Sequence, residues 1–141
     1  MSDELLLNEL GGVLAEQDAA WTAGDAPRFS ERVLPDAVFT NIFGQQFTGR
    51  EAFERQHAFI FSSIYAGSRL TQTIAHARAL AADVAAVDSD CEVHGAKVLP
   101  AGYASDDGVL RTKLLQVFVR RPEGWRIAAF HNVVVNPPPG A

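Results

Sequence analysis

His57 and a pair of aspartates are the residues of this chain whose types and spacing best suit acid–base chemistry. His57 falls on the apolar stripe of a predicted helix, together with Phe53 and Ile60, so its imidazole is expected to point toward the core. An imidazole in a cavity suits general acid–base catalysis near neutral pH. The alternative is a buried histidine that makes one hydrogen bond and takes no part in chemistry.

Asp88, Asp90 and Glu92 alternate along one predicted strand, so their side chains share a face. Buried like charges this close raise the pKa of at least one carboxyl group. Asp88 and Asp90 are therefore candidate catalytic residues beside His57, either as an acid–base pair or as ligands for a hard metal ion. The alternative is a solvated strand face, or carboxylates that pair with arginines on neighbouring strands: Arg69, Arg78 and Arg111.

Sequence motifs that would indicate a cofactor are missing. The four histidines show neither His-x-His nor His-Glu-x-x-His spacing, which argues against a metal site. There is no glycine-rich dinucleotide fingerprint and no phosphate loop, so we expect no cofactor. Cys91 is the single cysteine, which excludes an internal disulfide framework, and we expect it in the core.

The elements that position these residues change character partway along the chain. Residues 3–22 have apolar side chains at helical spacing and acidic residues in the first turn. A short helix follows, capped by Asp25 and expected to stop at Pro35. The Thr48-Gly49-Arg50-Glu51 segment fits the capping-box pattern, which predicts a third helix from there to about Ser63.

Beyond Gly67 the helical period disappears, and long strands take over. We expect strands at about 37–43, 68–80, 83–94, 109–121 and 125–135. Helices first and long strands last predict an α+β fold, with the helices packed on one face of an antiparallel sheet. The sequence shows no repeat and no linker, so residues 1–136 are expected to form one domain. The proline-rich residues 137–141 are expected to form a flexible tail.

Both faces of the predicted sheet carry many apolar side chains. Leu115 and Val117 alternate with Leu114 and Phe118, whereas a half-solvated sheet should alternate apolar with polar residues. No further helix is left to cover the second face, so we expect a homodimer through it. The same alternation directs Asn132 toward the helix side and His131 toward the dimer partner.

Composition excludes several other classes of protein. The chain has 141 residues, of which 48% are hydrophobic, so it can bury a proper core. Its formal net charge of −5 argues against a nucleic-acid or acidic-membrane partner. No apolar run reaches membrane-spanning length and the N-terminus lacks a signal-peptide layout, so we expect a cytoplasmic protein.

The order of elements resembles the nuclear transport factor 2-like superfamily, and within it the ketosteroid isomerase-like and SnoaL-like polyketide cyclase branch. Two segments carry the likeness: Asp36-Ala37-Val38-Phe39-Thr40-Asn41-Ile42-Phe43-Gly44 and Phe47-Thr48-Gly49-Arg50-Glu51. A third, Phe130-His131-Asn132, resembles small proteins found in enediyne biosynthesis clusters. The resemblance implies a cone-shaped, curved antiparallel sheet with three N-terminal helices on its concave face, which makes the second face convex. The superfamily hosts isomerases, cyclases, dehydratases and binding modules, so the fold names no reaction.

The resemblance also assigns positions to two amides. Asn41 stands where ketosteroid isomerase carries its aspartate base, and Gln116 stands where that family carries a protonated aspartate that donates to the oxyanion. A carboxamide cannot serve as a base at neutral pH, although it can donate a hydrogen bond. The resemblance therefore implies a pocket that binds a carbonyl group without isomerase chemistry. The alternative is that Asn41 caps a strand end and Gln116 satisfies the core.

Aromatic side chains with a few polar groups are typical of a pocket for a small organic molecule. The predicted substrate-binding residues are Trp21, Phe39, Asn41, Phe53, Phe61, Gln116, Phe118, Phe130 and Asn132. Two functions stay open. One is cofactor-free catalysis on a hydrophobic, oxygenated, polyketide-like molecule, and the other is a non-catalytic dimeric binding or accessory protein. Acid–base side chains inside the cavity would favour the first, and a cavity filled by aromatic side chains would favour the second.

Overall fold

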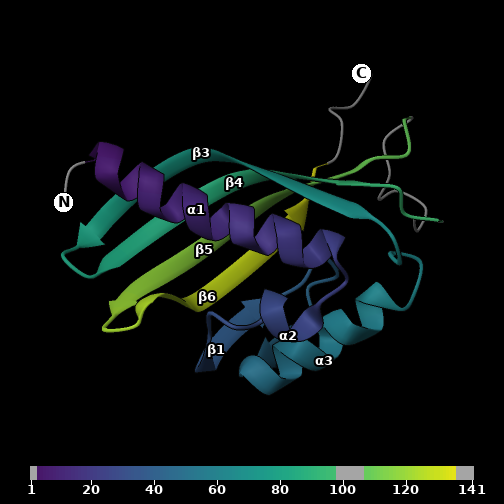
Figure 1. The fold of residues 1–141 in the computed structure, drawn as a ribbon, viewed down its shortest axis with the longest axis horizontal. Coiled ribbons are helices and arrows are strands. Elements are labelled where there is room, and N and C mark those ends of the chain that lie inside the picture. The colour runs from purple at the N-terminus through teal and green to yellow at the C-terminus, as the bar shows by residue number, and fades with distance from the viewer. Residues whose placement is uncertain (1–2, 98–106, 136–141) are drawn as a thin grey trace.

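The helices and the sheet form two layers in the computed structural model, which describes residues 3–97 and 107–135 (Figure 1). In chain order the elements are α1 (Asp3–Thr22), α2 (Ala26–Phe29), β1 (Val33–Thr40), β2 (Gln46–Thr48), α3 (Arg50–Phe61), β3 (Arg69–Ala81), β4 (Val84–His94), β5 (Leu110–Arg121) and β6 (Gly124–Val134). The predicted α+β fold is confirmed, with the short strand β2 as an addition. The predicted tail at 137–141 lies outside the described residues.

The strands form one curved, open sheet in the order β2-β1-β6-β5-β4-β3. Four of its pairs are antiparallel, as predicted, but β1 runs parallel to β6. A parallel pair needs a long crossover connection, and here α3 and the strands β2 to β5 supply it. The prediction of a purely antiparallel sheet is therefore corrected at this one pair.

α1 lies along the concave face of the long strands and buries one side there (Figure 1). Its buried residues recur at helical spacing: Leu6, Leu10, Val13, Leu14, Gln17 and Ala20. Polar contacts fix its direction over the sheet. Oε2 of Glu9 accepts hydrogen bonds from Nε1 of Trp125 at 2.7 Å and from Nη2 of Arg120 at 2.9 Å. None of the helices among residues 3–97 and 107–135 is long and apolar enough to cross a membrane.

The boundaries of the short elements differ in part from the sequence-based expectation. Asp25 caps α2 as predicted, with Oδ1 accepting from the backbone nitrogen of Arg28 at 3.1 Å. The capping box is wrong, because Gly49 is the N-cap of α3 and no side chain caps it. A Cβ at Gly49 would lie 3.0 Å from the carbonyl oxygen of Pro35, and the φ of 97° favours glycine. Pro35 itself lies within β1, outside the part that pairs with β2, rather than at the end of α2.

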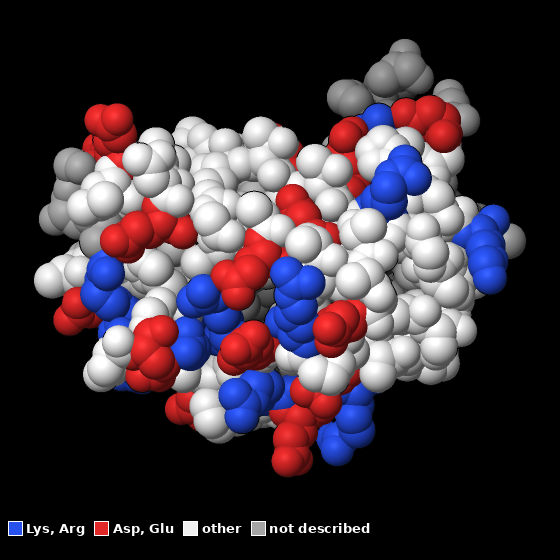
Figure 2. Space-filling view, viewed as in Figure 1, with Lys and Arg blue, Asp and Glu red and all other residues white. Residues whose placement is uncertain are grey.

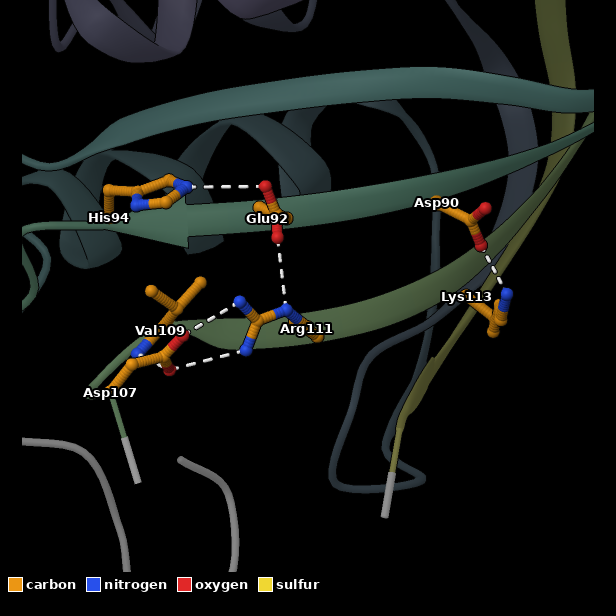
Figure 3. Close-up of polar contacts among 7 residues, drawn as sticks. All are labelled: Asp90, Glu92, His94, Asp107, Val109, Arg111 and Lys113. Atoms are coloured by element: carbon orange, nitrogen blue, oxygen red, sulfur yellow. Dashed lines mark hydrogen bonds and ion pairs between the residues drawn. The ribbon is translucent and has the colours of Figure 1, made fainter. Parts of the chain in front are cut away.

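The convex face of the sheet divides into an apolar part and a charged part. Leu115 and Val133 are 38% and 62% exposed and form the apolar part with their neighbours on β5 and β6. In the charged part, Nε of Arg111 donates to Glu92 at 2.9 Å and Nη2 of Arg111 donates to Asp107 at 2.8 Å. Figure 3 shows these contacts together with the pairs Lys113–Asp90 and His94–Glu92. Two carboxylates of β4, those of Asp90 and Glu92, thus pair with basic residues on the neighbouring strand β5.

Charge is also unevenly distributed on the helix side of the molecule. Figure 2 shows acidic and basic side chains intermixed over the lower part of this view, whereas few charges lie over the end of α3 and the segment that leads to β3. Two of the most exposed large apolar residues, Phe43 and Phe59, belong to the β1–β2 loop and to α3.

Candidate functional site

A cavity of about 440 Å³ lies between the helices and the concave face of the sheet. Alternation along the strands and helical spacing along α3 bring side chains from every layer into its wall. α1 supplies Gln17 and Trp21, α3 supplies Phe53 and His57, and the β1–β2 loop closes one side with residues 41–45. The volume lies within the range of about 300–1,000 Å³ that is typical of small-molecule sites.

The wall of the cavity carries no formal charge at neutral pH. Among the described residues that line it, none is Asp, Glu, Lys or Arg. Burial lowers the pKa of His57 to about 4, so its imidazole is neutral at pH 7. Burial also raises the pKa of the Cys91 thiol to about 11. The polar part of the wall consists largely of carboxamides: Gln17, Asn41, Gln45, Gln56, Gln72, Gln116 and Asn132.

His57 is held in an aromatic cluster, and its tautomer follows from one contact. Its Nδ1 lies 2.8 Å from the carbonyl oxygen of Phe53. Because a carbonyl only accepts, Nδ1 carries the hydrogen in this bond and Nε2 of the neutral ring is an acceptor. The ring stacks on Phe53 with centroids 4.1 Å apart and lies 4.8 Å from that of Phe29. His57 is therefore a hydrogen-bond acceptor in the wall and a weak base.

Three glutamines and an aspartate form a hydrogen-bonded chain that joins α1 to the sheet. Nε2 of Gln17 donates to Oε1 of Gln116 at 2.9 Å, and Nε2 of Gln72 donates to Oε1 of Gln17 at 3.0 Å. Gln72 also donates to Asp18 from its side chain and its backbone. Burial raises the pKa of Asp18, and these two hydrogen bonds oppose the shift. Each amide is satisfied by its neighbours, so the chain rigidifies the wall.

Asn41 closes the loop between β1 and β2 instead of presenting a free oxygen to the cavity. Its Oδ1 accepts from the backbone nitrogens of Phe43 and Gln45, both at 3.0 Å. Its Nδ2 donates to Oε1 of Gln45 at 3.0 Å. The side chain lines the cavity and also caps the strand end, which was the alternative that the sequence left open.

Asn132 differs from Asn41, because its side-chain oxygen accepts no hydrogen bond from any described residue. Among the described residues, its Oδ1 is the one buried side-chain nitrogen or oxygen without a hydrogen-bond partner. Asn132 lies on β6 in the wall of the cavity, opposite Leu114 of β5. A buried acceptor without a partner is unfavourable and calls for an explanation.

The structure places most of the predicted substrate-binding residues in the wall: Trp21, Phe39, Asn41, Phe53, Gln116, Phe130 and Asn132. Phe61 and Phe118 are exceptions. Phe61 packs edge-on behind Trp21, with ring centroids 5.0 Å apart. Phe118 is fully buried in the core below the cavity wall.

The expected placement of Asp88 and Asp90 in the cavity is wrong. Both are exposed on the convex face, and neither belongs to the wall. They alternate with Ser89 and Cys91, which are buried on the concave face. Because a strand has a period of two, only one of the two sets can face the cavity, and the less polar set does. The assignment of the two aspartates as acid–base partners of His57 thus loses its geometric basis.

Several wall residues were not predicted as site residues. Gln17 and Gln72 are polar, yet the helical and strand periods place them on the buried faces of their elements. A polar residue at a buried position is the sequence signal that could have identified them. Strict alternation along β6 would place Ile127 on the same face as His131, away from the cavity. A bulge in the β5–β6 register, between Val117 and Phe118, shifts the alternation and turns Ile127 toward the cavity.

The described residues offer no group of three or more His, Cys, Asp or Glu side chains that would hold a metal ion. The cavity wall instead offers aromatic surface, amide groups and one neutral imidazole. Such an arrangement can hold a neutral organic molecule and form hydrogen bonds with its oxygen atoms.

Solved structures with the same fold come from several bacteria. A protein with a cystatin-like fold from Caulobacter vibrioides is 23% identical, with a TM-score of 0.77 over 94% of this chain and 91% of that one. A ketosteroid isomerase-like protein from Erwinia carotovora atroseptica is 15% identical, with a TM-score of 0.73 over 97% of this chain and 100% of that one. An NTF-2 like protein of unknown function from Shewanella oneidensis MR-1 is 14% identical, with a TM-score of 0.74 over 89% and 97%. These likenesses confirm the fold.

The family follows from the sequence itself. No curated protein matches the chain. The SnoaL-like domain matches residues 13–136, a stretch that includes every residue of the cavity wall. The narrower likeness to proteins of enediyne clusters stays a prediction. The chain therefore belongs to the SnoaL-like domain family.

Proposed function

We propose that this protein binds a neutral, largely apolar, oxygenated organic molecule, such as a polyketide-like ring system, in the cavity without a cofactor. The observation that carries the proposal is the absence of Asp, Glu, Lys and Arg from the described wall. An ionised ligand would bury its charge there without a counter-charge, at a cost of several kcal/mol. A neutral ligand can pack against the aromatic side chains and contact the amide groups without this cost.

Binding rather than acid–base catalysis fits the wall best. The acidic side chains predicted to serve as partners of His57 lie on the convex face, and the pKa of His57, lowered by burial to about 4, makes it a weak base. The function supported best is therefore that of a non-catalytic binding or accessory protein. A cytoplasmic location belongs to the same proposal.

Cofactor-free catalysis is the second candidate, and His57 is the observation in its favour. The imidazole lies in the wall, with its Nε2 able to accept a proton or a hydrogen bond from a ligand. An enzyme of this kind would lose turnover in His57→Gln while still binding its substrate.

A matched pair of ligands tests the proposed function. Calorimetric titration should detect binding of 9-fluorenone, a neutral aromatic ketone. Its 4-carboxylate should bind at least about tenfold more weakly, because it carries a buried charge. Absence of binding by both compounds, or equal binding by the two, contradicts the proposal.

Two variants show whether binding occurs in the cavity. Leu114→Trp adds a large side chain to the wall and should abolish binding of 9-fluorenone. Leu80→Trp places the same side chain at an exposed position on β3 and should leave binding unchanged. Circular dichroism of both variants establishes that they are folded.

A further inference from the structure

One ring nitrogen of His57 has no hydrogen-bond partner among the described residues. Nδ1 lies 2.8 Å from the carbonyl oxygen of Phe53, and because a carbonyl only accepts, Nδ1 carries the hydrogen of the neutral ring. Nε2 therefore keeps a lone pair, and no described side chain or backbone group donates to it. The imidazole thus has one nitrogen that fixes its orientation and one that is an unused acceptor.

Nε2 of His57 is open to the cavity and is not shielded within the core. Among the described residues, Oδ1 of Asn132 is the one fully shielded side-chain nitrogen or oxygen without a partner, so Nε2, which also lacks a partner, retains accessible surface. His57 as a whole is only 6% exposed, and it belongs to the wall of the cavity. The accessible part of its ring therefore meets the cavity, where a ligand can reach it.

The aromatic side chains packed around the imidazole cannot supply the missing hydrogen. The ring centroids of Phe53 and Phe29 lie 4.1 Å and 4.8 Å from that of His57, and neither ring has a polar hydrogen. The ring of Trp21 lies 6.2 Å from that of His57, but its Nε1 already donates to Oγ of Ser68 at 2.9 Å. In these surroundings, Nε2 depends on a molecule in the cavity for its hydrogen bond.

We propose that the cavity selects a ligand that carries a hydroxyl group, and that this hydroxyl donates a hydrogen bond to Nε2 of His57. The inference rests on the proposed function and narrows its ligand class. The donor has to be uncharged, because no carboxylate among the described wall residues would balance an ammonium group. A hydroxyl group meets this condition at pH 7, whereas a ketone or an ether of similar shape has no hydrogen to donate. Burial lowers the pKa of His57 to about 4, so its ring is a neutral acceptor at that pH.

Three compounds test the inference on the wild-type protein: 1-naphthol, 1-methylnaphthalene, which has nearly the same shape, and 1-methoxynaphthalene, which keeps the oxygen but lacks its hydrogen. Calorimetric titration at pH 7 should show 1-naphthol binding about tenfold more tightly than either of the others, as expected for one hydrogen bond to a buried acceptor. Equal affinities, or binding of 1-methoxynaphthalene as tight as that of 1-naphthol, would overturn hydroxyl recognition and leave the proposed function standing. Absence of binding by 1-naphthol would overturn the inference, and absence of binding by 9-fluorenone as well would overturn both.

Replacement of the acceptor assigns the preference to a residue. His57→Phe removes both ring nitrogens and keeps an aromatic side chain of similar size in the wall. The affinities for 1-naphthol and 1-methylnaphthalene should then come to within about twofold of each other, through weaker binding of 1-naphthol. His76→Phe makes the same change at an exposed position on β3 and should preserve the tenfold preference. A preference that survives in folded His57→Phe would overturn the assignment to this residue.

Proton–nitrogen correlation spectra of the wild-type protein, with isotope-labelled histidine, observe the acceptor directly and need no substitution of His57. In the free protein, its nitrogen resonances should be those of an imidazole with the hydrogen on Nδ1. Addition of 1-naphthol should shift the Nε2 resonance toward that of a hydrogen-bonded nitrogen, and addition of 1-methylnaphthalene should not. A hydrogen on Nε2 in the free protein, or an Nε2 resonance that 1-naphthol leaves unchanged, would refute the inference.

Discussion

Nε2 of Gln17 on α1 and Oε1 of Gln116 on β5 are joined by a buried hydrogen bond of 2.9 Å. Gln116 is 1% exposed and Gln17 is 8% exposed, so water cannot replace the partner that either one loses. This contact fixes the height of α1 above the sheet at the back of the cavity. The family likeness had placed an oxyanion donor at Gln116. In the structure, Oε1 of Gln116 instead accepts this hydrogen bond from Gln17.

Replacing either glutamine alone should therefore destabilise the protein by about 1–3 kcal/mol, because the other amide remains buried without its partner. Gln17→Leu combined with Gln116→Leu should cost less than the sum of the two single changes, since no orphaned amide remains in this pair. Urea unfolding of the wild type, both single variants and the double variant measures the coupling. Strict additivity would contradict the structural role of this contact.

The buried His57 should make the protein sensitive to acid. Its pKa is lowered by burial from 6.5 to about 4, so the unfolded chain binds a proton that the folded protein excludes. The stability from this residue is fully present above pH 6.5 and is lost as the pH falls from 6.5 toward 4. The slope in this window is roughly 1.4 kcal/mol per pH unit at most.

Urea unfolding between pH 4 and pH 7 measures this loss, and His57→Gln should flatten the dependence. His76→Gln, at an exposed position on β3, is the control and should retain the wild-type slope. Asp18 acts in the opposite sense, because its raised pKa favours the folded state below that pKa. An unchanged slope in His57→Gln would refute the role assigned to the imidazole.

The protein should show no steroid isomerase activity. A general base contributes about 100- to 10,000-fold to such a proton transfer, and the family likeness places Asn41 at the position of that base. Asn41→Asp should not restore activity, because two backbone N–H groups donate to Oδ1 and would stabilise the carboxylate as a weak base. The absorbance assay with a β,γ-unsaturated ketosteroid tests both proteins, and turnover by either one would contradict this prediction.

The convex face should mediate a homodimer. Leu115 and Val133 leave an exposed apolar area there, beside the charged pairs of Figure 3. Light scattering at micromolar concentration should give the mass of two chains. Val117→Asp places an unpaired charge in the apolar part and should give a single-chain mass, whereas Leu80→Asp, away from it, should not. A wild-type monomer would be incompatible with this arrangement.

The sequence was informative wherever a regular period continued without interruption. α1 begins and ends where its apolar spacing predicts, and the alternation on β6 correctly separates Asn132 from His131. The prediction of which side chains face the cavity failed where a bulge shifted the alternation along a strand. The bulge next to Phe118 turns Ile127 inward, and no residue type in that stretch indicates a bulge.

The residues of the site were harder to predict than the fold, because the same residue types occur both in functional sites and in purely structural positions. Asp88 and Asp90 form a plausible catalytic pair by spacing alone, and only the packing of Ser89 and Cys91 decides which face meets the cavity. The missing hydrogen-bond partner of Oδ1 of Asn132 is another feature that no linear pattern encodes. Gln17 and Gln116 are far apart in the chain, so the sequence pattern could not predict their contact.

The parallel pairing of β1 with β6 also dictates when the cavity can come into existence. Val33 pairs with Ile127, and Phe39 pairs with Phe130, so the wall joins an early strand to the last strand of the described chain. Contacts between such distant segments carry a high loop-closure cost and form slowly. During synthesis, the edge of β1 that contains Phe39 cannot pair with β6 until β6 has left the ribosome. A ligand can therefore stabilise the finished protein but cannot guide the early steps of its folding.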